Sequence, residues 1–86
     1  MKDGLIVYLV NSPEPPEGFD AVQAAENLGE KAEQIEVVSA REGFFTVEDA
    51  WHFLLTRGCG RIRLLVAQAE DDLKLRPLGP AVRLCG

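Results

Sequence analysis

The sequence predicts a small α/β domain, a three-layer sandwich in which two main helices cover an open sheet of strand order 2-1-3-4. Residues 5–10 are an uninterrupted apolar run, typical of a strand that is covered on both faces. Residues 46–67 join an amphipathic helix directly to a second apolar run, as in the second half of a βαβ unit. The polar link 68–72 is shorter than the dozen or so residues that a parallel return needs. Strands 1 to 3 are therefore expected to be parallel, with strand 4 antiparallel at the edge.

The first βαβ unit is expected to end at the strand 35–38. Three prolines exclude regular structure from residues 11–18. Asp20 is placed to cap the following helix, and Gly29 ends that helix or weakens it there. The inner face of this helix carries Val22, Ala25, Leu28 and Ala32. The short apolar run 35–38 then predicts strand 2.

The second unit contains the clearest helix signals in the chain. Residues 46–49 have the form of a capping box that begins with Thr46, and Gly58 stands where a left-handed residue ends a helix. The apolar stripe of this helix consists of Val47, Ala50, Trp51, Leu54 and Leu55. We expect Trp51, Leu54 and Leu55 to face the sheet, against Val7, Leu9, Val37 and Leu64 or Val66. Residues 62–67 form strand 3.

The last part of the chain is expected to form the edge of the sheet. Residues 73–76 alternate as a half-exposed strand does, and Pro77 restricts that strand to an edge. Residues 81–86 read as a short tail in which Val82 and Leu84 cover an edge.

Composition limits the function classes. The 86 residues make one domain, and an apolar content of 47% excludes disorder. The net charge is −5, with −8 over residues 1–50 and +3 over residues 51–86, which argues against general nucleic-acid binding. No run is long enough to cross a membrane and no targeting signal is visible, so the sequence predicts a cytoplasmic protein without membrane contact. Cys59 and Cys85 form no metal or redox motif.

Four segments resemble the small CbiX-type sirohydrochlorin chelatases, also called class II chelatases. Residues 10–15 (Val-Asn-Ser-Pro-Glu-Pro) stand in the place of that family's first loop, and residues 45–50 (Phe-Thr-Val-Glu-Asp-Ala) match the start of its second helix. Gly58 and residues 61–67 match the helix stop and third strand, and residues 77–80 (Pro-Leu-Gly-Pro) match the end of its fourth. The resemblance implies a degenerate and shortened relative of these metal-inserting enzymes.

The departures from that family concern its metal-binding histidines. The first would fall near Val10 or Asn11, neither of which can replace it. The second lies on a helix after the third strand, and residues 68–72 replace that helix here. If the resemblance holds, the metal-insertion residues are missing, and we expect neither a metal site nor a cofactor.

The candidate ligand site is the crevice at the carboxyl ends of the strands, where the strand order reverses. It would be lined by Asn11, Ser12, Ser39, Arg41 and Gln68. Acidic side chains stand on the same rim, namely Glu14, Glu17, Glu42, Glu70, Asp71 and Asp72. Convergence of these carboxylates would hold a hard cation, but solvated acidic loops are the simpler interpretation. The loop 11–20 is rich in proline and acids and lacks the glycines of a phosphate-binding turn.

No set of residues is self-evidently catalytic. His52 is the only histidine and is expected on the surface of a helix. Cys59 follows a helix C-terminus, where the dipole disfavours a thiolate, so we expect a buried or inert thiol. Two functions remain open: a non-catalytic domain that works by self-association, as a homodimer, or by binding a protein partner; and a tetrapyrrole-binding or metal-chelatase-like enzyme that uses the crevice of strands 1 and 3.

Overall fold

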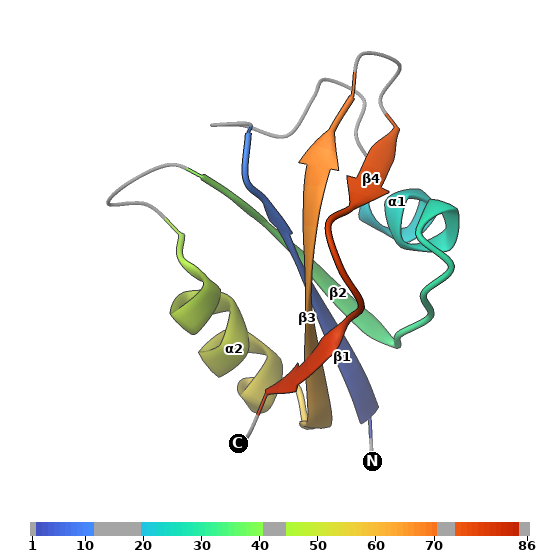
Figure 1. Ribbon diagram of the computed structural model, residues 1–86. Coiled ribbons are helices and arrows are strands. Elements are labelled where there is room, and N and C mark those ends of the chain that lie inside the picture. The colour runs from blue at the N-terminus through green and yellow to red at the C-terminus, as the bar shows by residue number, and fades with distance from the viewer. Residues whose placement is uncertain (1, 12–19, 41–44, 71–73, 85–86) are drawn as a thin grey trace.

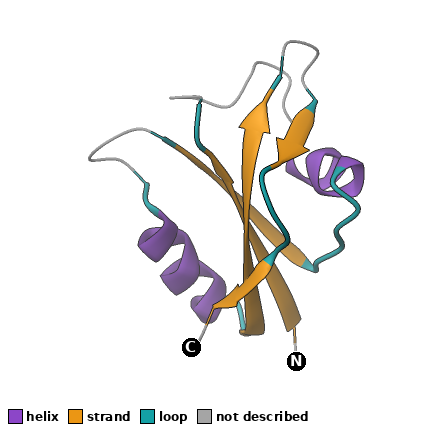
Figure 2. Cartoon of the chain, viewed as in Figure 1, coloured by secondary structure: helices purple, strands orange, loops and turns teal. Residues whose placement is uncertain are grey.

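Strands and helices alternate along the first two thirds of the chain, and strands alone make up the rest. The computed structural model describes residues 2–11, 20–40, 45–70 and 74–84 (Figures 1 and 2). The elements are β1 (Lys2–Leu9), α1 (Ala21–Asn27), β2 (Gln34–Ser39), α2 (Val47–Thr56), β3 (Cys59–Ala69), β4 (Leu75–Pro77) and β5 (Val82–Leu84).

The sheet is mixed, and β1 lies at its centre. β1 pairs in parallel with β2 on one side and with β3 on the other, so that Val7 lies opposite both Val37 and Leu65. β4 runs antiparallel to β3, with Gln68 opposite Arg76. The resulting order is β2-β1-β3-β4, which confirms the order and the strand directions predicted from the sequence.

The far edge of the sheet differs from the expectation in two respects. β3 continues to Ala69, so Gln68 belongs to the strand and not to the link after it. The tail contains a fifth strand, because β5 pairs antiparallel with β3 and places Arg83 opposite Arg63. β4 and β5 thus share one edge of β3. Residues 78–81 lie between them and interrupt the regular pairing, since these four residues stand opposite only residues 65–66 of β3, where the Leu78 N–H still donates to the Val66 oxygen.

Two apolar clusters lie on opposite faces of the sheet. α1 covers the first cluster, which contains Leu5, Val7, Leu9, Ala24, Ala25, Leu65, Ala67 and Leu75. α2 covers the second, which contains Ile6, Val38, Ala50, Leu54, Cys59 and Ile62. Figure 1 shows the two helices on either side of the strands. The three-layer α/β sandwich is therefore confirmed.

The predicted partners of α2 are wrong by one residue along β1 and β2. Val7, Leu9 and Val37 face α1, whereas Ile6 and Val38 face α2. The physical reason is that successive side chains of a strand alternate between the faces, and both faces of this sheet are apolar. Leu55 is also 41% exposed, because it lies at the margin of the apolar stripe, while Leu54 is fully buried. Leu64 packs against the α2 cluster, as expected.

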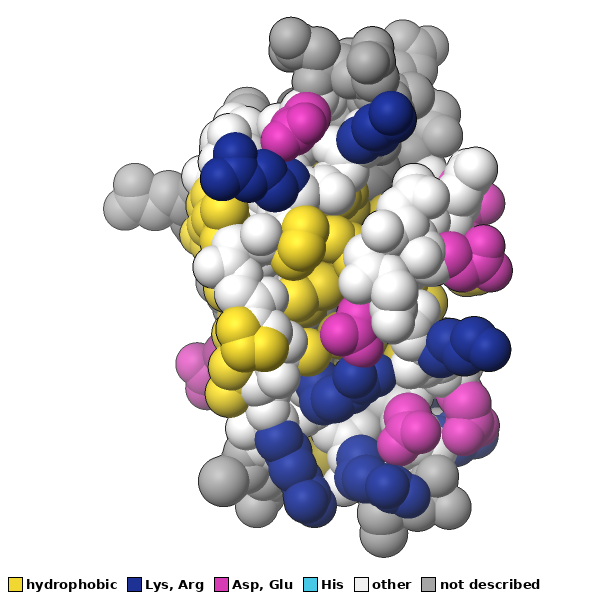
Figure 3. Space-filling model, turned by 45° about the vertical axis from the view of Figure 1, so that its right-hand side comes forward, with side chains coloured by type: hydrophobic (Ala, Val, Ile, Leu, Met, Phe, Trp, Pro, Cys, Tyr) yellow, Lys and Arg dark blue, Asp and Glu magenta, His cyan; other side chains and the backbone are white. Residues whose placement is uncertain are grey.

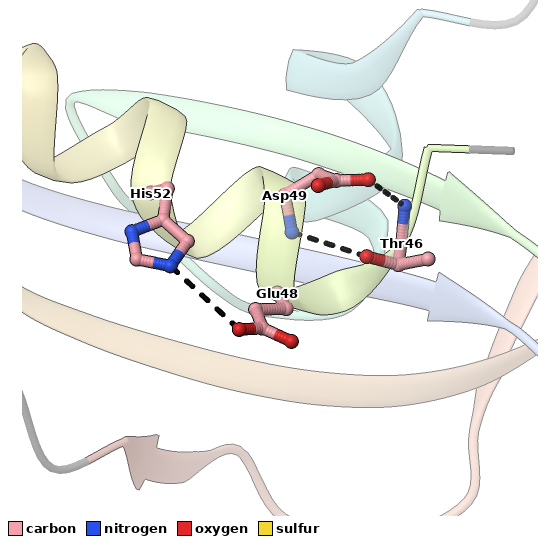
Figure 4. A network of polar contacts seen from close by, with 4 residues as sticks. All are labelled: Thr46, Glu48, Asp49 and His52. Carbon is pink, nitrogen blue, oxygen red and sulfur yellow. Dashed lines mark hydrogen bonds and ion pairs between the residues drawn. The ribbon is translucent and has the colours of Figure 1, made fainter.

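Both helices begin and end where the sequence places their caps. The carboxylate of Asp20 accepts hydrogen bonds from the amides of Val22 and Gln23. Thr46 and Asp49 form the reciprocal capping box that begins α2 (Figure 4). Gly29 and Gly58 adopt the left-handed conformation, with φ of 74° and 85°, directly after the two helices.

An ion pair ties the turn after α1 to the sheet. Arg63 of β3 donates to the carboxylate of Glu30, and its second guanidinium nitrogen donates to the backbone oxygen of Lys31 at 2.8 Å. Arg63 is the register partner of Arg83 on β5, so two like charges stand on the same face of the sheet and Glu30 supplies an opposite charge beside them.

Candidate functional site

The predicted crevice lies where β1 and β3 end side by side. Asn11 follows β1, and its side-chain amide meets the backbone of Ala69 in both directions. Nδ2 donates to the Ala69 oxygen at 2.9 Å, and Oδ1 accepts from the Ala69 N–H at 2.9 Å. Asn11 therefore continues the β1–β3 ladder beyond the last backbone bond, Val10 N to Ala67 O. Both polar atoms of its amide already serve the fold.

The other crevice residues do not gather around Asn11 within the described ranges. Ser39 ends β2 and pairs with Leu9, on the other side of β1 from β3. Gln68 is half-buried in β3 and points to the α2 face, since Ala67 and Ala69 point to the other. Ser12 and Arg41 lie outside the described residues, so the crevice as a ligand site stays a prediction.

Of the six acidic residues predicted on the rim of the crevice, only Glu70 lies in the described part of the chain. Glu70 is exposed, and its N–H donates to the Lys74 oxygen at 2.8 Å, next to the β3–β4 connection. Glu14, Glu17, Glu42, Asp71 and Asp72 fall outside the described residues. In residues 2–11, 20–40, 45–70 and 74–84, no three His, Cys, Asp or Glu side chains come together as a metal site would require.

His52 lies on the outer surface of α2, as the sequence predicted. Its side chain is 61% exposed, and Nε2 is 3.8 Å from Oε1 of Glu48, one turn earlier (Figure 4). Its ring centroid is 5.0 Å from that of Trp51. These two contacts of His52 are a carboxylate and an indole. Neither is a hydroxyl or a thiol that His52 could activate as a nucleophile.

Cys59 is buried at the start of β3, which confirms the burial expected of its thiol. Its residue is 3% exposed and belongs to the α2 cluster. Burial raises the pKa of the thiol above its ordinary value. The protonated form that results is a poor nucleophile. Cys85 lies outside the described residues.

The two edges of the sheet are unequal. Within the part of the chain that the structure describes, no strand pairs with the outer side of β2. β2 carries neither proline nor a basic residue, and its one charge is Glu36. Burial raises the pKa of Glu36, and the nearby Arg57 partly offsets this effect. The opposite edge is divided into β4 and β5, which contain Arg76, Pro77 and Arg83.

Several large apolar side chains of the described residues reach the surface, namely Val10, Val22, Phe45, Leu55, Leu78 and Val82. On the face drawn in Figure 3, hydrophobic side chains gather at the centre, and charged side chains of both signs lie around them. Val82 and Leu78, in the β4–β5 segment, are 58% and 47% exposed. This edge therefore presents apolar side chains together with arginines.

A surface pocket lies between α2 and β5. It has a volume of about 300 Å³ and is lined by Val47, Glu48, Trp51 and Leu84. The sequence predicts Trp51 on the apolar stripe but does not predict the pocket, because the opposite wall is Leu84 of β5, a segment expected to be a tail. The signal that was available is the apolar alternation of Val82, Arg83 and Leu84.

Comparison of the chain with protein-family models, with curated proteins and with solved structures gave no match. The resemblance to CbiX-type chelatases accordingly stays a prediction from the sequence. Among the described helices, none has the length and apolar character needed to cross a membrane.

Proposed function

We propose that this chain is a non-catalytic binding domain that associates with a second copy of itself through the outer edge of β2. The observation that carries the proposal is the inequality of the two sheet edges. An edge strand offers unpaired backbone N–H and C=O groups, and natural proteins protect such edges with proline, lysine or arginine, and bulges. β4 and β5 carry proline and arginine, whereas β2 carries neither, and its one charged side chain is Glu36.

The side chains of β2 support pairing between two copies about a two-fold axis. In an antiparallel pair, directly opposite residues share a face, so a symmetric pair of β2 strands is centred on one residue facing itself. If the pair were centred on Glu36, the two Glu36 carboxylates would face each other and repel. A centre at Val37 instead places Val37 against its own copy and Glu36 against Val38. The Val37-centred arrangement is therefore the one we propose.

Partly buried apolar side chains on β2 add to this argument. Ile35 and Val37 pack against the α1 cluster but remain partly exposed at the edge. A second β2 strand would cover both side chains and would extend each apolar cluster across the interface. The titratable groups of the described residues, by contrast, form no constellation of nucleophile and base, which favours binding over catalysis as the proposed role.

The experiment combines mass measurement with a cysteine scan of β2. Sedimentation at high micromolar concentration is expected to give twice the chain mass of 9.4 kDa. In a Cys85→Ser background, Val37→Cys is expected to form a disulfide-linked dimer under mild oxidation, because the two copies of residue 37 face each other. Ser39→Cys is the matched control on the same strand and face, and it should not cross-link to itself. A monomer mass, or cross-linking that is equal for both variants, would contradict the proposal.

A further inference from the structure

The pocket between α2 and β5 combines apolar walls with one carboxylate. Val47 and Trp51 stand one helical turn apart on α2, and Leu84 closes the opposite side from β5. In Figure 1 the last, red strand runs beside α2 near the C-terminus. Glu48 is the only charged side chain among the described residues of this lining.

The pocket contains two polar groups, the carboxylate of Glu48 and the indole N–H of Trp51. The side chain of Glu48 is 80% exposed, and its only ion-pair neighbour among the described residues is His52, at 3.8 Å. The indole Nε1 of Trp51 is buried and has no hydrogen-bond partner in the described structure. Buried polar groups are usually paired, so the indole N–H of Trp51 is left for an acceptor such as a backbone carbonyl of a bound segment, whereas the exposed carboxylate of Glu48 is open to a cation.

We propose that this pocket binds a lysine side chain from an exposed segment of a partner protein. A lysine has a long aliphatic stem and a terminal ammonium, and it can bury the stem while the charge stays at the surface. Here the stem would lie against Val47 and Leu84, with the ammonium beside the carboxylate of Glu48.

The indole of Trp51 strengthens this assignment. A cation over the face of a tryptophan gains electrostatic attraction from the ring, and tryptophan is the best of the aromatic side chains for this contact. An anionic group would be repelled by Glu48, and a neutral aliphatic group would leave that carboxylate without a counter-charge. The net charge of −5 further favours a basic partner.

Trp51 is the only tryptophan of the chain, so its fluorescence reports on the pocket alone. The probe is Nα-acetyl-lysine amide, and the matched probe is the norleucine analogue, which keeps an aliphatic stem but lacks the ammonium. The lysine probe is expected to give a saturable change in emission. The affinity for the norleucine probe is expected to be lower by a factor of roughly five or more, because this probe loses the cation–π and ion-pair contributions.

The variant Glu48→Gln should weaken binding of the lysine probe by a similar factor, while Glu26→Gln should not change it. Glu26 is an exposed acid on α1, across the sheet from the pocket, and it controls for the general effect of net charge. Both sites are exposed, and a thermal melt of each variant verifies the fold. The proposal is overturned by equal binding of the two probes, by binding that Glu48→Gln leaves unchanged, or by the lack of any saturable change. The pocket contains no β2 residue, so this test does not depend on self-association.

Discussion

Gly4 and Leu54 meet so closely that a β-carbon built on Gly4 would lie 3.1 Å from Cδ1 of Leu54. The same β-carbon would lie 3.2 Å from Sγ of Cys59. Leu54 is fully buried and Cys59 is 3% exposed, so both neighbours lie inside the α2 cluster and would have to shift by a few tenths of an ångström. The glycine in β1 therefore sets how closely α2 approaches the sheet.

Gly4→Ala is expected to lower the free energy of unfolding by about 1–3 kcal/mol, because the added methyl group overpacks the α2 cluster. Urea denaturation followed by circular dichroism measures the change. Gly79→Ala is the control, since a β-carbon there meets no atom within 4 Å. Equal stability of the two variants would show that the side chains of the α2 cluster shift to accommodate the added methyl group.

Leu54→Ala is expected to lower the free energy of unfolding by about 2–5 kcal/mol, because it removes a fully buried side chain and leaves a cavity. Leu55→Ala, at the next position of the same helix, should cost less than about 1 kcal/mol because Leu55 is 41% exposed. In a Gly4→Ala background the cost of Leu54→Ala should fall, since the new methyl group occupies part of the cavity. Additive costs would contradict the contact between the two sites.

The α2 cap is expected to give a pH-dependent contribution to stability. The Thr46 N–H donates to the carboxylate of Asp49, and the Thr46 hydroxyl accepts from the Asp49 N–H. These contacts with Thr46, the backbone N–H first, hold the pKa of the Asp49 carboxyl below the ordinary value of 3.8. A group with a lowered pKa in the folded state stabilises above its unfolded pKa, and this contribution is lost as the pH falls through the folded pKa. The difference in melting temperature between the wild type and Asp49→Ala should therefore be full above pH 3.8 and shrink at lower pH. A difference that stays constant down to strongly acidic pH would show that charge plays no part in the cap.

We expect no metal insertion into sirohydrochlorin above the uncatalysed rate. Metal insertion needs a ligand that also accepts protons, a role for which neutral imidazole is suited. The one histidine, His52, is 61% exposed on α2 and lies beside Glu48. The measurement is the absorbance of the metallated product with cobalt or ferrous iron, with and without protein. Protein-dependent turnover that disappears on changing Glu14, Glu42 or His52 would establish the enzyme alternative, and His52→Ala should not reduce any ligand binding.

The topology could be predicted because connection lengths and apolar runs determine it. The short link after strand 3 requires an antiparallel return, and the helix ending at Gly58 delivers the chain directly into β3. The facing of side chains could not be predicted in the same way. A run such as residues 5–10 is apolar at every position, so its sequence does not reveal which residues face α1 and which face α2.

The candidate site was harder to predict than the fold because its residues make their contacts with residues that are far away in the sequence. Asn11 was placed correctly at the end of β1, but nothing in the sequence reveals that its amide is taken up by Ala69, 58 positions later. The Trp51 pocket depends on Leu84, which becomes a wall only when β5 pairs with β3. The alternation of Val82, Arg83 and Leu84 is a signal for this strand, but over three residues it does not show which strand β5 pairs with.

If the chain pairs through β2 as proposed, the division of the far edge into β4 and β5 would limit how large the assembly can grow. Each of these strands has three residues, and the irregular residues 78–81 separate them, so this edge is a poor template for a further strand. A sheet with two competent edges can add copies without end and form a fibre. With only β2 competent, two copies joined across a two-fold axis use up both of their templates, and growth stops at the pair.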